Sequence, residues 1–248
     1  MKKIILISIV AAMMMSLTAC MNKPEAKDEV TFNSYIEDTI PEETEATEET
    51  TTAAPEETEA TEEVTEAVED DASLSTFSAN GCSIKVNTST WLDVIDYIEA
   101  VKSVSGETDE MKALEEKIKT TCDAAYYYED ISGANFTIVS QEVGEQASQM
   151  DLSDNIISGM LASALEQELT KSGMAFVGAD TERYNGNPSL VVTVDSPAII
   201  TGTVDMRAQM CIFYEGTHQY MITYTAEKEH FDKYKPDFDK VMDSITFN

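Results

Sequence analysis

Apolar residues recur along this chain in two rhythms, one of every second residue and one of every third or fourth. The alternating rhythm predicts strands, in chain order, over residues 82–87, 124–128, 135–143, 174–184, 188–195, 204–214 and 217–226. The longer rhythm predicts helices over residues 91–101, 110–120, 151–172 and 231–245. Asn185-Gly186 is a strong signal for a two-residue hairpin turn between two of the strands.

Polar and special residues mark where these helices begin and end. Thr90 or Asp93 is suited to cap the first helix, and Gly106 suits its end. Asp151 is expected to begin the long helix, whereas Pro236 predicts a kink or a late start in the last one. The long helix carries one predicted core stripe, made of Leu152, Ile156, Ile157, Met160, Leu161, Ala164, Leu165 and Leu169.

The last two strands indicate the architecture. A two-residue turn at Glu215-Gly216 would join them, and in that register Phe213 faces His218. Cys211 then faces Tyr220. Both faces of this strand pair are apolar, so we expect it in the centre of a sheet that is covered on both sides. The predicted fold class is therefore α+β: an antiparallel β-sheet flanked by helices on both faces, an α/β/α sandwich.

The first twenty residues have a different character. Lys2 and Lys3 precede a short apolar run, which is typical of a secretory signal, since a membrane-spanning helix needs about 20 apolar residues. The sequence from Leu17 to Cys20 resembles a bacterial lipobox. The resemblance implies that residues 1–19 are a lipoprotein signal peptide and that a diacylglyceryl group anchors Cys20 in the membrane. An ordinary cleaved signal with an incidental Cys20 is the alternative.

Residues 20–72 follow as a second segment of unusual composition. Residues 21–72 hold 19 acidic and 2 basic residues, and the nonapeptide at 41–49 returns at 55–63. Few large apolar side chains and strong charge repulsion predict a disordered acidic tether rich in Thr and Glu. O-glycosylation of its threonines is left open. A long spacer after a lipobox resembles surface lipoproteins of Gram-positive bacteria, which implies the extracytoplasmic face of the cell membrane.

The remaining residues, 73–248, have the length of one globular domain. They hold 28 acidic and 12 basic residues, and the whole chain has a net charge of -31. Nucleic-acid binding depends on cationic side chains that release counterions, so we expect no nucleic-acid partner. An anionic membrane would also repel the chain, so only the lipid on Cys20 would hold it there.

Three stretches of the predicted domain carry a family resemblance: residues 82–86 ahead of Trp91, residues 135–139 ahead of the long helix, and residues 219–225 ahead of the closing helix and 244–247. Their order resembles the PsbP-like superfamily, which includes the photosystem II extrinsic protein and the DcrB-like bacterial lipoproteins. The resemblance implies an α/β/α sandwich and a non-enzymatic accessory or binding role.

Tyrosines supply one candidate binding site. Five of them would line a ligand cleft between the sheet and a helix: Tyr126, Tyr127, Tyr128, Tyr220 and Tyr224, with all but Tyr127 as the candidate site residues. The alternative is that these tyrosines belong to the core and rim of a packed sheet. A small-ligand or solute-binding lipoprotein is therefore a second hypothesis beside binding to a protein partner.

Cysteines supply the one nucleophile hypothesis. In the expected register Cys211 and His218 share a sheet face, so a thiolate activated by an imidazole would make a Cys–His hydrolase. The alternative is that Cys211 is a small buried hydrophobe. A disulfide between Cys82 and Cys122 is also left open, because both residues would lie at strand starts.

Acidic residues around the start of the long helix are the remaining candidates. Asp151, Asp154 and Glu145 offer oxygen ligands of the kind calcium prefers, but helix capping explains acids at this place as well. We expect neither a metal nor a cofactor. The sequence thus predicts a non-catalytic binding or assembly domain, held out from the cell surface on an acidic tether.

Overall fold

The computed structural model describes four stretches of the chain: residues 73–129, 133–145, 147–198 and 204–248. The predicted signal peptide (1–19), the predicted lipidation site Cys20 and the predicted tether (20–72) lie outside the described residues. Those three expectations therefore stay predictions.

Ten described strands form two antiparallel sheets. The larger sheet has the spatial order β3-β4-β5-β9-β8-β7-β6. Its strands are β3 (Trp91–Asp93), β4 (Ala124–Tyr128), β5 (Asn135–Glu142), β6 (Ala175–Tyr184), β7 (Asn187–Ser196), β8 (Met206–Glu215) and β9 (His218–Glu227). The smaller sheet, of order β1-β2-β10, contains β1 (Leu74–Ala79), β2 (Cys82–Asn87) and β10 (Thr246–Phe247). Strands β8 and β9 bury side chains on both faces, as expected for central strands.

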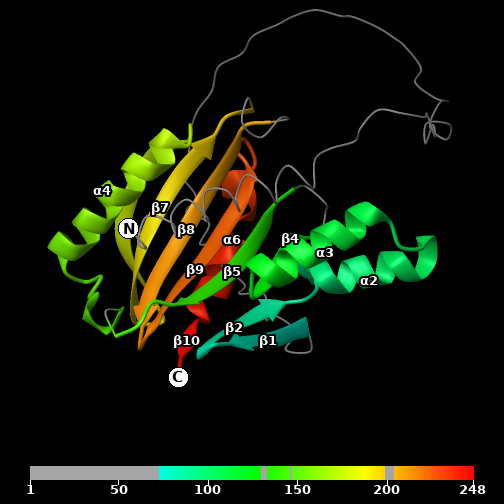
Figure 1. Ribbon diagram of the computed structural model, residues 1–248, viewed down its shortest axis with the longest axis horizontal. Helices are drawn as coiled ribbons and strands as arrows, with labels where there is room; N and C mark the ends of the chain where they lie inside the picture. Colours follow the sequence, from blue (N-terminus) through cyan, green and yellow to red (C-terminus); the bar gives the residue numbers. More distant parts are fainter. Residues whose placement is uncertain (1–72, 130–132, 146, 199–203) are drawn as a thin grey trace, which may run out of the picture. The chain divides into compact units, whose positions relative to one another are not determined.

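Helices cover the seven-stranded sheet on both sides (Figure 1). The α-helices are α2 (Val94–Ser105), α3 (Asp109–Thr121), α4 (Asn155–Lys171) and α6 (Phe231–Asp243), and the short 3-10 helix η2 is Ala147–Gln149. On one side, the aromatic face, α6 and the smaller sheet pack over one buried cluster. On the other side, the helical face, α4 packs on β6 and β7 while α2 and α3 pack on β4. The predicted fold class is confirmed.

Capping side chains explain where α2 and α3 begin. The Asp93 carboxylate accepts the backbone N–H of Ile95 at 2.8 Å, and the Thr108 hydroxyl accepts that of Met111 at 3.2 Å. Gly106 ends α2 with a φ of +83°, in the left-handed region that favours glycine. Of the two predicted caps, Asp93 is therefore confirmed, as is the end at Gly106, whereas the helix starts at Val94 and not at residue 91.

The register of the last hairpin differs from the prediction. The observed pairs are Glu215 with His218, Phe213 with Tyr220, and Cys211 with Ile222. The turn thus lies at Gly216-Thr217, and Gly216 has a φ of +57°. The register moved by two residues, so each side chain kept its predicted face.

The sequence did not predict three short or half-exposed strands, β1, β3 and β10. Trp91 was expected in a helix, but it pairs with Tyr128 as the first residue of β3. Strand β10 spans two residues, which is too few to show an alternation. Strand β1 has no fully buried residue, so its pattern gives no clear apolar face.

The starts of two helices test the predictions made from Asp151 and Pro236. Asp154 rather than Asp151 caps α4, because the Asp154 carboxylate accepts the backbone N–H of Ile156 at 2.8 Å. Helix α6 starts at Phe231 and continues through Pro236, so the expected late start is wrong. Pro236 cannot donate a backbone hydrogen bond within the helix. Burial of Phe231, Tyr234 and Phe238 along one side of α6 offsets the cost of that missing bond.

Candidate functional site

The structure brings the predicted site residues together on the aromatic face: Tyr126, Tyr128, Tyr220 and Tyr224. Three of them are 0–6% exposed, and Tyr128 is half-buried. The Tyr224 hydroxyl donates to the carbonyl oxygen of Phe231 at 2.8 Å, and the Tyr128 hydroxyl donates to Oδ2 of Asp237 at 2.7 Å. Hydrogen bonds therefore fix these rings against α6.

Other aromatic rings fill the space between these tyrosines. The Trp91 ring stands edge-on to Tyr128 and Phe136, with centroids 5.1 and 4.9 Å apart, and Tyr224 stacks on Phe238 at 5.0 Å. Burial raises the pKa of Tyr224, which keeps its hydroxyl neutral. The four tyrosines belong to a packed interior, and ligand binding by them stays a prediction. Tyr127, expected in the same cleft, lies instead in the cluster of the helical face, because successive residues of a strand point to opposite faces.

The turn between β1 and β2 closes one edge of the aromatic face. The Tyr220 hydroxyl donates to the carbonyl oxygen of Asn80 at 2.5 Å, and Asn80 Nδ2 donates to the Ser140 hydroxyl at 2.6 Å. The backbone N–H of Asn248 donates to the carbonyl oxygen of Gly81 at 2.9 Å. A Cβ on Gly81 would lie 3.1 Å from the Asn248 carbonyl oxygen, so this approach favours glycine.

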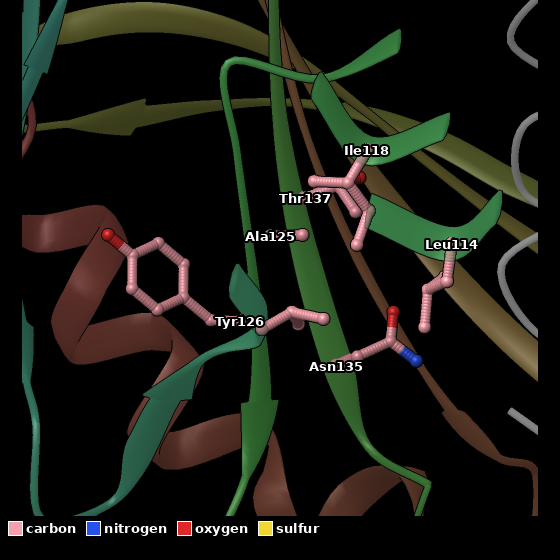
Figure 2. Close-up of a pocket in the computed structure, with 7 residues that line it drawn as sticks. Leu114, Ile118, Ala125, Tyr126, Asn135 and Thr137 are labelled. Atoms are coloured by element: carbon pink, nitrogen blue, oxygen red, sulfur yellow. The ribbon is translucent and has the colours of Figure 1, made fainter. Parts of the chain in front are cut away.

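A small pocket lies on the helical face, beside α3 and strands β4 and β5 (Figure 2). Its lining residues are Val94, Leu114, Ile118, Ala125, Tyr126, Asn135 and Thr137. The Tyr126 ring points away from Leu114 and Ile118, toward the aromatic face. Burial raises the pKa of this tyrosine to about 12. The cavity volume of about 10 Å³ is roughly that needed by one water molecule.

Cys211 and His218 do not form the predicted dyad. Glu215, which pairs with His218, is four residues from Cys211 along β8, or roughly 13 Å at the rise of a strand. The Cys211 sulfur instead lies 3.6 Å from Nε2 of Gln209 and 3.8 Å from the Tyr184 hydroxyl. Complete burial raises the pKa of the Cys211 thiol to about 12. The Cys–His hypothesis is wrong, and Cys211 is a buried, protonated thiol.

The other described cysteines are also free thiols, so the open alternative of a Cys82–Cys122 disulfide is not realised. Cys82 begins β2 as expected, but Cys122 forms the C-cap of α3 rather than a strand start. Burial raises the pKa of both thiols, to about 12 for Cys82.

The acidic residues near α4 act through local hydrogen bonds. Asp154 caps the helix, and the Asp151 carboxylate accepts the hydroxyl and backbone N–H of Ser153 at 2.6 and 2.9 Å. These bonds lower the pKa of Asp151. Glu145 is exposed. Within the four described stretches, no group of three or more His, Cys, Asp or Glu side chains is placed to hold a metal ion.

Helix α4 exposes apolar side chains that the sequence assigned to the core. Ile156 and Met160 are 72% and 71% exposed. With Gly159 and Ser163, which are also exposed, they occupy positions i, i+3, i+4 and i+7 along one side of the helix. We call these four residues the outer face of α4. The buried residues of the helix lie on its opposite side and are Ser158, Leu165 and Leu169.

The predicted stripe on α4 was too wide. At roughly 100° per residue, Ile156 lies about 180° around the helix from Leu165, so the two cannot face the same core. Ala164 is exposed as well, so its predicted place in the stripe is wrong too. The angular position of each residue around the helix separates the buried side of α4 from its exposed side, whereas the number of apolar residues does not.

No protein-family model matches this chain. No curated protein matches it either. Of the helices in the described part of the chain, none is both long and apolar enough to cross a membrane.

Three solved structures show a distant likeness. The solution structure of cyanobacterial PsbP (CyanoP) from Synechocystis sp. PCC 6803 is 13% identical, with a TM-score of 0.44, covering 73% of this chain and 96% of that one. A crystal structure from Bacteroides thetaiotaomicron is 12% identical, with a TM-score of 0.40, covering 70% and 48%. Protein PA94 from Pseudomonas aeruginosa is 8% identical, with a TM-score of 0.36, covering 71% and 97%.

The first of these structures bears the name of the family that the sequence resembles. At such low TM-scores, however, the likenesses carry no argument about function. The α+β class rests on the strands and helices themselves.

Proposed function

We propose that this chain is a lipid-anchored protein of the cell surface whose domain, residues 73–248, binds a protein partner without catalysis. The lipobox-like sequence before Cys20 supports the anchor, and the acidic Thr/Glu-rich composition of residues 21–72 supports a spacer. Two acyl chains hold a protein stably in a membrane, whereas one holds it only marginally.

The outer face of α4 is the observation that carries the binding role. A side chain such as Ile156 or Met160 gains roughly 1.5–3 kcal/mol when it is fully buried, yet both remain exposed in this chain. The aromatic face, by contrast, already buries its large side chains, such as Trp91 and Phe238. The exposed apolar side chains on the outer face of α4 therefore favour docking of another protein there.

The state of Cys211 supports a non-catalytic role. A nucleophilic cysteine needs an accessible thiolate, but Cys211 is fully buried and burial raises the pKa of its thiol to about 12. We expect iodoacetamide to leave Cys211 unmodified in the folded protein at pH 7 and to modify it only in denaturant. Rapid modification of Cys211 in the folded state would contradict the non-catalytic proposal.

The anchor is tested by metabolic labelling. Cells that produce the full chain are grown with an alkyne analogue of palmitate, and the chain is expected to take up the label and to sediment with membranes. Cys20→Ser should lose both properties, whereas the matched control Cys82→Ser should keep them. A Cys20→Ser chain that still carries the label would refute lipidation at this residue.

A further inference from the structure

The outer face of α4 contains a glycine that the described fold does not require. Gly159 lies inside the helix, where glycine is about 1 kcal/mol less favourable than alanine. A Cβ at this position would have no steric neighbour within 4 Å, and the residue has no positive φ. Neither packing nor backbone conformation within the domain therefore explains the glycine.

The neighbours of Gly159 show what it permits. Ile156 and Met160 project on the same side of α4, one turn apart, and Ser163 continues that side with a small residue. A helix that docks in a groove uses anchors at i, i+3, i+4 and i+7, and a glycine among them lets the partner's backbone approach closely.

Charge distinguishes this surface from the rest of the molecule. Residues 155–165 contain no charged side chain, although 25% of the chain is charged. Exposed acids stand at both ends of this uncharged run, with Asp151 and Asp154 before it and Glu166 after it. A partner that covers the outer face meets an apolar centre and an acidic rim.

We propose that the outer face of α4 docks into an apolar groove of a protein partner whose rim carries Lys or Arg side chains. This inference rests on the proposed binding function and names the chemistry of its partner. Ile156 and Met160 are the apolar anchors, Gly159 allows the close approach, and the acids at the two ends of the run pair with the basic rim.

A second copy of this chain is a poorer occupant. Residues 73–248 hold 28 acidic and 12 basic residues, so two copies repel one another at long range. The same acids would meet across a symmetric α4–α4 contact, because a two-fold interface joins one patch to itself. Residues 21–72, with 19 acidic and 2 basic residues, would also be repelled from the acidic rim.

Site-specific photo-crosslinking in the cells that produce the protein tests the proposal. A benzophenone amino acid replaces Ser163 in the full chain, and the matched control places it at Val104, an 89% exposed apolar position on α2. We expect a discrete adduct from position 163 and none from position 104. The crosslinked partner peptide should lie within an apolar surface bordered by Lys or Arg residues.

Two variants make the test quantitative. Gly159→Ala should lower the adduct yield roughly tenfold while the domain melts at the same or a higher temperature, since alanine favours the helix. Ile156→Ser should also lower the yield roughly tenfold. Loss of the adduct together with retained folding separates docking from damage to the domain.

Several results would overturn the proposal. An adduct with a second copy of the chain, an adduct with residues 21–72, or an acidic rim on the captured surface would refute the stated partner. An unchanged yield with Gly159→Ala, or no adduct at position 163, would refute docking at the outer face. In that last case, retained membrane anchoring through Cys20 would leave the proposed surface location intact.

Discussion

The two sides of the seven-stranded sheet are built differently. On the aromatic face one continuous cluster joins α6, the smaller sheet and the central strands. On the helical face, α4 lies apart from α2 and α3 (Figure 1), and the buried cluster beneath α4 shares no residue with the cluster beneath α2 and α3. The aromatic face thus packs as one continuous core, while on the helical face α4 and the α2–α3 pair pack on the sheet through separate cores.

The two sides of the sheet therefore contribute differently to stability and to binding. On β9, the buried hydroxyl of Tyr224 has a partner on the aromatic face, whereas the buried hydroxyl of Thr223, the preceding residue, points to the helical face and has no partner in the structure. Because the aromatic face buries its side chains in one larger, continuous cluster, we infer that it supplies most of the free energy of unfolding. The helical face supplies exposed surface, including the outer face of α4.

The largest loss of stability is expected from emptying the centre of the aromatic face. Phe238 is fully buried against Phe136 and Tyr224. Phe238→Ala should lower the free energy of unfolding by about 3–5 kcal/mol, because it removes apolar contacts and leaves a cavity. Urea denaturation followed by far-UV circular dichroism measures the loss.

Ile118 is the matched position on the helical face. It is 2% exposed and borders the small pocket beside α3, so its surroundings have room to relax. Ile118→Ala should cost about 2 kcal/mol, at the low end for such a truncation. A larger loss for Ile118→Ala than for Phe238→Ala would reverse the assignment of the stable side.

Two neighbouring hydroxyls on β9 give a finer contrast. Tyr224→Phe should cost about 1–2 kcal/mol, since it removes the hydrogen bond to the Phe231 carbonyl oxygen. Thr223→Val should be neutral or stabilising by up to about 1 kcal/mol, because it removes a buried hydroxyl without a partner. The same denaturation assay checks both, and a costly Thr223→Val would show that its hydroxyl does find a partner.

Strand positions could be predicted from the sequence better than strand pairing. Strands β2 and β4 were predicted at their observed bounds, because a buried strand shows either clear alternation or a continuous apolar run. The register of β8 and β9 was not, because Glu215-Gly216 and Gly216-Thr217 both have turn residues and only the pairing of Glu215 with His218 distinguishes them. Periodicity locates an element, but pairing with its neighbours sets its register.

The candidate site was harder to predict than the fold. The sequence placed Tyr126 and Tyr224 on one face correctly, yet it could not tell a cleft from a filled interior, since both use the same residues. It placed Ile156 and Met160 in the core because α4 is apolar on two sides. Hydrophobicity alone does not say which apolar side of a helix meets the domain.

A smaller effect is expected from the glycine of the outer face. Gly159→Ala should raise the free energy of unfolding by about 0.5–1 kcal/mol, because alanine loses less backbone entropy in a helix and its Cβ meets open space. Thermal denaturation of the purified chain measures the gain. Destabilisation would mean that Gly159 serves the fold itself, which would remove the reason to connect it with a partner.

The smallest effect concerns acid and the attachment of α2 to α3. Glu115 accepts hydrogen bonds from Lys102 and, secondly, Lys119, and these bonds lower its pKa to about 2. A carboxyl group whose pKa is lowered by folding stabilises the fold above its unfolded value, near 4.5, and loses that contribution as the pH falls toward 2. Acid should therefore loosen the α2–α3 pair first.

The expected signature is local. Between pH 4.5 and 2, NMR chemical shifts of α2 and α3 should move toward random-coil values before the fluorescence of Trp91, the one tryptophan of the chain, reports any change on the aromatic face. In Glu115→Gln, which cannot titrate, the part of this shift due to Glu115 should vanish. If α2, α3 and Trp91 respond together at every pH, the two sides of the sheet unfold as one unit. The α2–α3 pair would then have no lower local stability than the aromatic face.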